Sequence, residues 1–406
     1  MREKRSSGRD RHNRRGSLDI SELVRPNVLT LAPYEAKIIP CRVKLDANES
    51  PYRRPVSPRL LKAVETNRYP DPQAGALRRE FARRMLPSSI GKKGGAGRVL
   101  HGNGSDELIW NLICTFGGPV VYPTPTFSMY AKIAQALGAK SVGVPLTRDF
   151  EIDDARMIRT MRDEKAKIVF ISRPNNPTGN SFSEEKILRI IGKAECIVVV
   201  DEAYQPFSDK KSFLGRLAGH GNLAVLMTLS KIGFAGLRVG FLVAGPELIA
   251  QVNKVRLPFN VNSLSQAVAA DALRNPGRLE GGIRKVVSER KRVFGALSKM
   301  KGVAPCPSDA NFILFRVSSL DAGPRLDAGK VWRRALREGM LLRGNLGSEL
   351  DRDFMRVTIG TRMENNAFIE FMKKTFQSAR TEKTMKKAGD KILEKGRRAP
   401  VKRSYR

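Results

Sequence analysis

Five short apolar runs in the middle of the chain constrain its fold more than any other feature. They span residues 119–122, 167–171, 196–200, 224–228 and 239–243. Each ends near a turn or a polar residue, as the buried strands of a parallel sheet do. Helical patterns lie between several of the runs, and in residues 184–192 the apolar positions fall on one face. This alternation predicts an α/β fold with a mostly parallel central sheet and crossover helices.

The pattern changes after Pro258. Helical patterns at 263–273, 284–300 and 331–338 then accompany strand patterns at 311–317 and 354–359. The mixture predicts a smaller α+β domain. We therefore expect five parts along the chain, which are a basic disordered arm (1–17), a segment joining the small domain (18–50), a large domain (51–275), a small domain (276–377) and a basic disordered tail (378–406).

The composition is ordinary for a soluble enzyme, with 41% hydrophobic and 28% charged residues. The four cysteines, at positions 41, 114, 196 and 306, are far apart. This spacing favours neither a zinc site nor a disulfide framework, so we expect no metal and a reducing, cytoplasmic location. No apolar run approaches the roughly 20 residues that span a bilayer, so we expect no membrane partner.

The formal net charge of +34 is unusual, and it is not confined to the ends of the chain. Residues 2–15 hold seven basic and two acidic side chains, and residues 380–406 hold eleven and three. The ends therefore carry 13 of the 34 charges, and the body carries the other 21. Such a surface attracts anionic ligands or nucleic acid, but net charge by itself chiefly governs solubility. We favour solubility and do not expect a nucleic-acid partner.

A lysine and an aspartate follow two of the predicted strands. Lys231 comes after the run 224–228 in a loop punctuated by glycine, and Asp201 comes directly after the run 196–200. In an open α/β sheet, ligands bind beyond the carboxyl ends of the strands, so both side chains are expected at one site. An amine nucleophile and a carboxylate are what pyridoxal 5'-phosphate (PLP) requires, as a Schiff-base lysine and a partner for its ring nitrogen.

A glycine-rich turn opens a predicted helix at Ser105 and Asp106. We expect Ser105 to cap this helix, whose free backbone N–H groups would bind a phosphate. Ser230 and Arg238 can add a hydroxyl and a guanidinium to the same anion, because arginine matches phosphate oxygens in a bidentate manner. These four residues are predicted to hold the phosphate of the cofactor.

Three further side chains are expected around the cofactor ring. Asn176 and Tyr204 can hydrogen-bond its hydroxyl, and Phe127 can stack on its face. Each motif is common by itself, and Asn-Pro-Thr-Gly is a good turn in any protein. Their order along the chain, each at the edge of a strand or helix, favours a PLP site. Lys231 then also serves as the general base that moves the Cα proton of the substrate.

The chain resembles the fold-type I PLP enzymes of the aspartate aminotransferase superfamily from about residue 20 to 375. Within this superfamily it is most similar to the class II-like histidinol-phosphate aminotransferases. Four segments carry the finer resemblance, namely residues 45–51 (Leu-Asp-Ala-Asn-Glu-Ser-Pro), 68–71 (Arg-Tyr-Pro-Asp), 254–266 and 355–361. The resemblance implies a homodimer whose active site is shared between the two subunits.

The resemblance also implies how the substrates bind. Tyr69 matches a tyrosine that reaches the cofactor phosphate from the neighbouring subunit. Arg343 and Arg356 match anion-binding arginines, and Tyr34 matches a tyrosine near the substrate phosphate. The implied reaction converts L-histidinol phosphate and 2-oxoglutarate to imidazole acetol phosphate and L-glutamate in histidine biosynthesis. Relatives often have tyrosine at the stacking position, where Phe127 keeps the ring and lacks the hydroxyl.

Three alternative functions stay open from the sequence. Relatives with these motifs include aromatic amino acid aminotransferases and L-threonine-O-3-phosphate decarboxylases, and release of CO2 would identify the latter. A nucleic-acid-binding regulator with an aminotransferase-like body would need a helix-turn-helix module, for which an arm of about 17 residues is too short. His101 precedes the phosphate turn, but we do not expect it to be catalytic, because the lysine transfers the proton.

Overall fold

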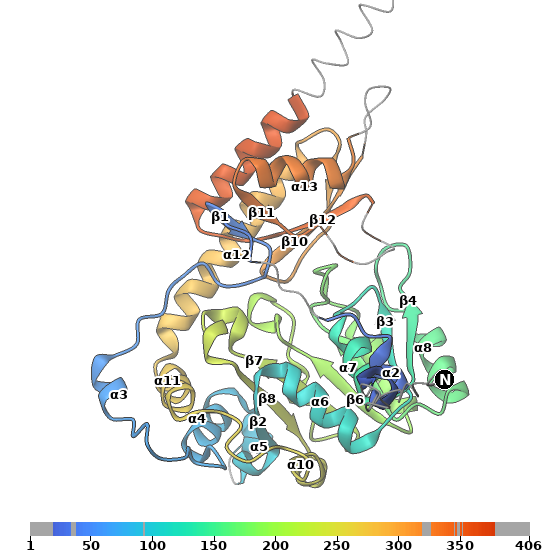
Figure 1. Ribbon diagram of the computed structural model, residues 1–406, viewed down its shortest axis with the longest axis vertical. Helices are drawn as coiled ribbons and strands as arrows, with labels where there is room; N and C mark the ends of the chain where they lie inside the picture. The colour runs from blue at the N-terminus through green and yellow to red at the C-terminus, as the bar shows by residue number, and fades with distance from the viewer. Residues whose placement is uncertain are drawn as a thin grey trace, which may run out of the picture.

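The computed structural model describes residues 19–33, 38–91, 94–318, 326–344, 346, 350 and 352–377. The expected basic arm and tail lie outside these ranges, as does Tyr34. A broad unit is built around a central sheet, and a smaller unit lies above it (Figure 1). The long helix α12 (Pro276–Ser298) runs from one unit to the other. No helix within the described ranges is both long and apolar enough to cross a membrane.

The central sheet has seven strands in the order β2-β8-β7-β6-β5-β3-β4. The strands are β2 (Val99–Asn103), β3 (Val120–Thr124), β4 (Ser141–Pro145), β5 (Ile168–Ser172), β6 (Ile197–Asp201), β7 (Leu223–Thr228) and β8 (Val239–Ala244). Neighbours from β7 through to β4 pair in parallel, whereas β8 is antiparallel to both β7 and β2. The predicted α/β class with a mostly parallel sheet is confirmed.

One strand direction differs from the prediction, which treated residues 239–243 as a parallel strand. In the structure β8 pairs with β7 in antiparallel register, with Val243 opposite Val225. Only residues 229–238 separate the two strands, and a parallel return needs a crossover of a dozen or more residues. The two strands therefore form a hairpin, and its connection carries Lys231.

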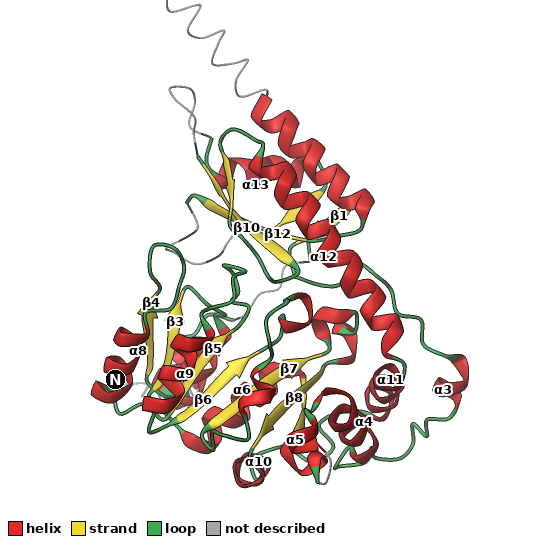
Figure 2. Cartoon of the chain, turned by 180° about the vertical axis from the view of Figure 1, so that it is seen from behind, coloured by secondary structure: helices red, strands yellow, loops and turns green. Residues whose placement is uncertain are grey.

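Helices cover both faces of the sheet, because successive strand residues point to opposite sides. Phe170 and Ile171 of β5, for example, belong to the two different buried clusters. On the Phe170 side lie α6 (Gly104–Phe116), α7 (Met129–Leu137) and α10 (Pro246–Asn253), and on the other side lie α4 (Gly75–Met85), α8 (Asp154–Asp163), α9 (Glu184–Lys193) and α11 (Ser263–Arg274). Figure 2 shows the same sheet from behind, with its helices on both sides.

The smaller unit has a sheet of its own, in which β10 (Phe312–Val317) lies between two antiparallel neighbours. These are β9 (Val303–Pro305) and β12 (Phe354–Thr358), and α13 (Ala328–Arg337) and a helix over residues 362–377 accompany them. β1 (Val43–Leu45) pairs in parallel with β11 (Met340–Leu342), so the N-terminal segment contributes a strand here. Helix α12 begins at Pro276, eight residues before its predicted start, because proline is accepted in the first turn of a helix.

Four short helices lie at the margins of the large unit. They are α1 (Ile20–Leu23), α2 (Pro26–Leu29), α3 (Pro58–Lys62) and α5 (Ser88–Gly91). Asn27 Nδ2 donates to the backbone oxygens of Gln135 and Ala136 at the end of α7, at 2.8 and 3.0 Å. These bonds fasten the N-terminal segment to the large unit before the chain reaches β1.

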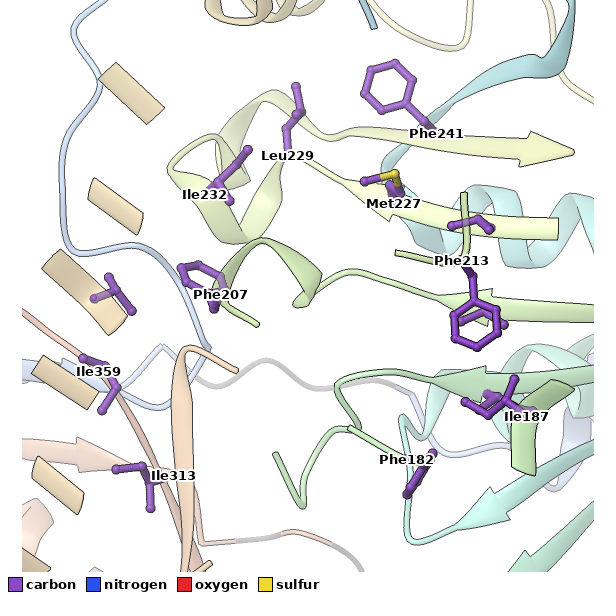
Figure 3. Close-up of a cluster of buried hydrophobic side chains, with 14 of the residues drawn as sticks. Phe182, Ile187, Phe207, Phe213, Met227, Leu229, Ile232, Phe241, Ile313 and Ile359 are labelled. Carbon is purple, nitrogen blue, oxygen red and sulfur yellow. The ribbon is translucent and has the colours of Figure 1, made fainter. Parts of the chain in front are cut away.

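One buried cluster links the sheet, the hairpin connection and the small unit (Figure 3). Met227 belongs to β7, Leu229 and Ile232 flank the predicted cofactor lysine, and Ile313 and Ile359 come from the small unit. The residues beside Lys231 are therefore anchored in the core, so the loop that carries the amine is held in place by apolar packing.

Candidate active site

The candidate site lies where β5, β6 and β7 end. Asp201 is the last residue of β6, and Lys231 follows β7 in a short 3-10 turn, Ser230–Ile232. Because the carboxyl ends of parallel strands meet at one edge of a sheet, this topology brings the two residues to the same edge. Lys231 Nζ lies 5.7 Å from the centroid of the Tyr204 ring.

Asp201 is a buried carboxylate with two hydrogen-bond donors. Its side chain is 3% exposed, and its oxygens accept from the Tyr130 hydroxyl at 2.7 Å and the Ala203 backbone N–H at 3.0 Å. Burial raises the pKa of Asp201 to about 6, and the two donors and the nearby charge of Lys231 oppose this rise. A buried carboxylate whose pKa stays raised despite these groups is suited to a cationic ligand.

Tyr130 is a site residue that the sequence reasoning missed. It is fully buried on α7, its ring stacks on Phe170 with centroids 4.7 Å apart, and Phe127 meets it edge-on at 5.6 Å. Burial, and then the charge of Asp201, raise the pKa of Tyr130 well above its ordinary value. Tyr130 therefore stays a neutral donor to Asp201. No pattern in the sequence points to this contact, because the two residues lie 71 positions apart.

Arg238 meets the N-terminus of α6, as the phosphate prediction requires. Arg238 Nη1 donates to Ser230 Oγ at 3.4 Å, and Nη2 donates to the Asp106 carboxylate at 3.1 Å. A Cβ on Gly240 of β8 would lie 2.7 Å from the Ser105 backbone nitrogen, so glycine there lets the helix N-terminus approach the strand. The structure thus brings the four predicted phosphate residues together.

The prediction that Ser105 caps α6 is wrong. The helix begins at Gly104 with Asn103 as its N-cap, so Ser105 is its second residue. Gly104 has a φ of 79°, a left-handed conformation that favours glycine, and the N-cap lies two residues earlier than predicted. Ser105 still lies in the first turn, where backbone N–H groups have no partner within the helix.

Tyr204 and Asn176 contact residues of the small unit. The Tyr204 hydroxyl accepts from Asn48 Nδ2 at 3.0 Å, and its ring meets the edge of Phe312 at 5.1 Å. Asn176 Oδ1 accepts from Arg356 Nη1 at 2.5 Å. Asn48 lies within the segment 45–51 that carried the resemblance, but nothing in that segment indicates its partner. These contacts close the site between the two units.

Arg356 is buried in β12 and its guanidinium is fixed by three neighbours. Besides its bond to Asn176, Nη2 donates to the backbone oxygen of Asp46 at 2.6 Å, and the group lies over the Phe312 ring at 5.1 Å. Arg343 is exposed and pairs with Arg356 through two backbone hydrogen bonds of 3.1 and 2.9 Å. Directly opposite residues of an antiparallel pair share a face, so both arginines lie on one side of this ladder.

Tyr69 does not join the other site residues through any contact found among the described residues. It is 82% exposed, and its ring stacks on Phe259 with centroids 4.6 Å apart. Tyr34 lies outside the described residues. The structure of one chain therefore brings together eleven predicted residues, which are Ser105, Asp106, Phe127, Asn176, Asp201, Tyr204, Ser230, Lys231, Arg238, Arg343 and Arg356.

His101 directly precedes the glycine-rich turn that opens α6. It is 1% exposed, and burial, together with the charges of Arg256 and Arg78, lowers the pKa of His101 to about 4. The imidazole is therefore neutral near pH 7, and its Nε2 lies 3.5 Å from Arg256 Nη1. Within the described ranges no cluster of three His, Cys, Asp or Glu side chains could hold a metal.

The donor set fits PLP. The buried carboxylate of Asp201 suits a protonated ring nitrogen, and Ser230 and Arg238 at a helix N-terminus suit a phosphate. Lys231 supplies a primary amine between these two ends, which suits an aldehyde. These groups provide a carboxylate that can pair with a cation, an anion-binding site and a nucleophile at one edge of the sheet.

Comparisons with known proteins agree with this chemistry. The model of the family described as aminotransferase class I and II matches residues 34–372. Histidinol-phosphate aminotransferase 2 of Nitrosococcus oceani is 40% identical over 366 residues, covering 87% of this chain and 97% of that protein. The histidinol-phosphate aminotransferase of Sinorhizobium meliloti, solved in complex with pyridoxal-5'-phosphate, shares the fold with a TM-score of 0.75 at 22% identity, over 87% of this chain and 97% of that one. That of Clostridium acetobutylicum has a TM-score of 0.73 at 23% identity, over 83% and 99%.

Proposed function

Because this chain belongs to the class I and II aminotransferase family, we propose that it transfers the amino group of L-histidinol phosphate to 2-oxoglutarate, with PLP as cofactor. One observation carries the reaction class, namely that Lys231, Asp201 and Arg238 converge at one edge of the sheet. The substrate rests on relatives named histidinol-phosphate aminotransferase that share 40% and 38% of their residues with this chain.

The cofactor would be held at both ends by residues of the large unit. Ser230, Arg238 and the backbone N–H groups of Ser105 and Asp106 would hold its phosphate. Asp201 would keep its ring nitrogen protonated, and Tyr130 would orient that carboxylate. When bound, PLP supplies an electron sink for the charge left on the substrate Cα as its proton departs. Phe127, which meets Tyr130 edge-on, is placed to lie against the ring.

Lys231 is the proposed group that accepts the Cα proton and returns it. Its loop is anchored by the buried side chains of Leu229 and Ile232, which fixes the backbone from which the amine extends. The charge of Lys231 also opposes the rise that burial causes in the pKa of Asp201, which favours the carboxylate that a protonated ring nitrogen needs. The same two residues thus hold the cofactor and carry the proton transfer.

Arg356 is the proposed site for the anionic group that both substrates share. Asn176 and the Asp46 backbone hold its guanidinium at 2.5 and 2.6 Å, so it meets a carboxylate or phosphate without reorganising. Arg343, on the same side of the ladder, is the proposed second anion contact, with Tyr34 near the substrate phosphate. Two arginines at one pocket would explain how a phosphate ester and a dicarboxylate can both bind.

The proposal includes a homodimer, and an exposed apolar surface supports it. The surface comprises Leu61, Tyr69, Val255, Leu257, Phe259 and Leu264. Arg256 Nη2 donates to the Pro72 backbone at 2.9 Å and Gln266 Nε2 to the Asp71 backbone at 3.0 Å, so these segments are tied together. Tyr69 and Phe259 stack with centroids 4.6 Å apart, and exposed apolar side chains on neighbouring segments suit a protein–protein interface. Tyr69 would then reach the cofactor phosphate of the partner subunit.

A cytoplasmic location is also proposed. All four cysteines are unpaired. Burial raises the pKa of the Cys196 and Cys306 thiols to about 11, so these two thiols stay protonated and unreactive. Unpaired thiols suit a reducing compartment. Fractionation of the source cells tests this, and recovery of the protein outside the cytoplasm would contradict it.

The decisive assay is amino transfer to 2-oxoglutarate by the purified, PLP-loaded protein. L-Histidinol phosphate and L-phenylalanine are compared as donors, and L-threonine-O-3-phosphate is tested for CO2 release. A strong preference for histidinol phosphate supports the proposal. Preference for phenylalanine would assign an aromatic aminotransferase, and CO2 release would assign a decarboxylase.

A further inference from the structure

Asn48 has an unusual place in the fold. It follows β1, is 1% exposed and adopts a left-handed backbone with φ of 55°, which few residues other than glycine, asparagine and aspartate accept. Its backbone oxygen accepts from Asn311 Nδ2 at 2.9 Å. Its backbone N–H donates to Thr358 Oγ1 at 2.9 Å. A strained residue held by this many bonds points to a task for its side chain.

The hydrogen bonds around Asn48 fix which way its amide points. The Thr358 hydroxyl accepts from the Asn48 backbone, and its single hydrogen is donated to Asn48 Oδ1 at 3.1 Å. With its oxygen facing Thr358, the amide presents Nδ2 to the Tyr204 hydroxyl at 3.0 Å. An amide nitrogen only donates, so the Tyr204 oxygen must accept there. The hydrogen of Tyr204 therefore points away from Asn48.

We propose that Asn48 is a positioning residue, which aims the Tyr204 hydroxyl hydrogen at the ring oxygen of the cofactor. This inference rests on the proposed PLP chemistry. Tyr204 follows β6 of the large unit, whereas Asn48 and Thr358 belong to the small unit. The direction of one hydrogen in the cofactor site is thus set from the neighbouring unit, through Thr358 and Asn48.

The direction of the Tyr204 hydrogen affects how tightly the bound cofactor holds a proton. A hydrogen donated to the ring oxygen stabilises its anionic form, so the nitrogen that Lys231 contributes to the bound cofactor holds its proton less tightly. The charged groups around Tyr204 are Lys231 at 5.7 Å from its ring, Asp201 on the preceding strand, and Arg356 beyond the Phe312 ring. None of these three groups is itself replaced in the Asn48 variants, so the test must separate only the hydrogen of Tyr204 from the charge that an aspartate at position 48 adds.

Asn48→Asp reverses the donor and the acceptor in the hydrogen bond between residue 48 and Tyr204, with little change in the shape of the side chain. Aspartate accepts the left-handed backbone, and its carboxylate can only accept, so it draws the Tyr204 hydrogen away from the cofactor. The readout is the pH at which the visible absorption band of the PLP-loaded protein changes. In Asn48→Asp we expect this midpoint to rise by about one pH unit, which is a tenfold gain in proton affinity. The midpoint should also rise in Tyr204→Phe, which has no hydroxyl hydrogen to donate.

The double variant separates the hydrogen from the added charge. If Asn48 acts through Tyr204, adding Asn48→Asp to Tyr204→Phe moves the midpoint no further. If Asn48→Asp shifts the midpoint equally in the wild type and in Tyr204→Phe, the new charge acts directly and the inference is overturned. An unchanged midpoint in the single variant Asn48→Asp would also overturn it.

Asn48→Gly is the second variant in case Asn48→Asp does not fold. Glycine suits the backbone and removes the amide without adding charge, so the midpoint should rise by less than in Asn48→Asp. A midpoint equal to that of the wild type would overturn the inference. Failure of the proposed function looks different, because the wild-type protein itself would then show no visible band that depends on Lys231.

Discussion

Asp201 should cost the PLP-free protein stability, and replacing it by asparagine should reveal how much. Burial raises its pKa from an ordinary value of 3.8 to about 6. At 1.36 kcal/mol per pKa unit, ionising this buried carboxyl costs about 3 kcal/mol. The amide of the Asp201→Asn variant can accept from Ala203 and donate to Tyr130, whose hydroxyl can turn, so shape and bonding are kept while the charge is lost.

The direction in which stability changes with pH follows from the raised pKa of Asp201. Because the folded pKa lies above the unfolded one, the folded wild type loses stability as pH rises from about 4 to 6. The Asp201→Asn protein has no such loss, so its advantage in the free energy of unfolding should grow with pH. We expect this advantage in the free energy of unfolding to be under about 1 kcal/mol at pH 4 and about 3 kcal/mol at pH 8. Glu202 is also buried, and burial raises its pKa to about 7. Because Glu202 titrates in both proteins, its contribution to the difference in the free energy of unfolding largely cancels.

Denaturant unfolding of the two PLP-free proteins, repeated from pH 4 to 8, measures this difference. Amino transfer by the variant should fall by orders of magnitude, since asparagine cannot hold the ring nitrogen protonated. An advantage that is independent of pH, or a variant less stable than the wild type at pH 8, would refute the electrostatic account of Asp201. A variant with normal turnover would refute its role toward the cofactor.

Four further outcomes are expected. Lys231→Ala should keep the unfolding midpoint of the wild type while losing the visible PLP band and turnover; retained activity would contradict the assignment. Arg356→Lys loses the planar guanidinium, whose two terminal nitrogens bond Asn176 and Asp46 separately, so KM for 2-oxoglutarate should rise about tenfold or more, and an unchanged KM would move the anion site elsewhere. Tyr69→Ala and Lys231→Ala, each inactive as purified, should regain part of the activity when their subunits are mixed, because a mixed dimer holds one intact site; no recovery would count against a shared site. Filter binding to duplex DNA should be weak, and tight binding with a steep salt slope would revive the nucleic-acid alternative.

Much of the fold and of the site could be predicted because the signals are local. The five apolar runs became strands, since buried strands need apolar side chains on both faces. Lys231 and Asp201 could be placed at strand ends from their positions alone. Ser230 and Arg238 flank the same loop, so their approach to one anion also follows from short-range geometry. The error at the α6 cap has a local cause too, because a glycine in left-handed conformation lies at the start of the helix and the N-cap is two residues earlier than predicted.

The amino-acid sequence by itself determined the α/β class, the lysine and aspartate at neighbouring strand ends and the family, because these depend on residue type and short spacing. Only the tertiary structure decided the direction of β8, the bond from Tyr130 to Asp201, and the chain from Thr358 through Asn48 to Tyr204. The last of these joins residues 156 and 310 positions apart. Contacts over such distances depend on how the units pack, and no local pattern encodes the direction of a hydroxyl hydrogen.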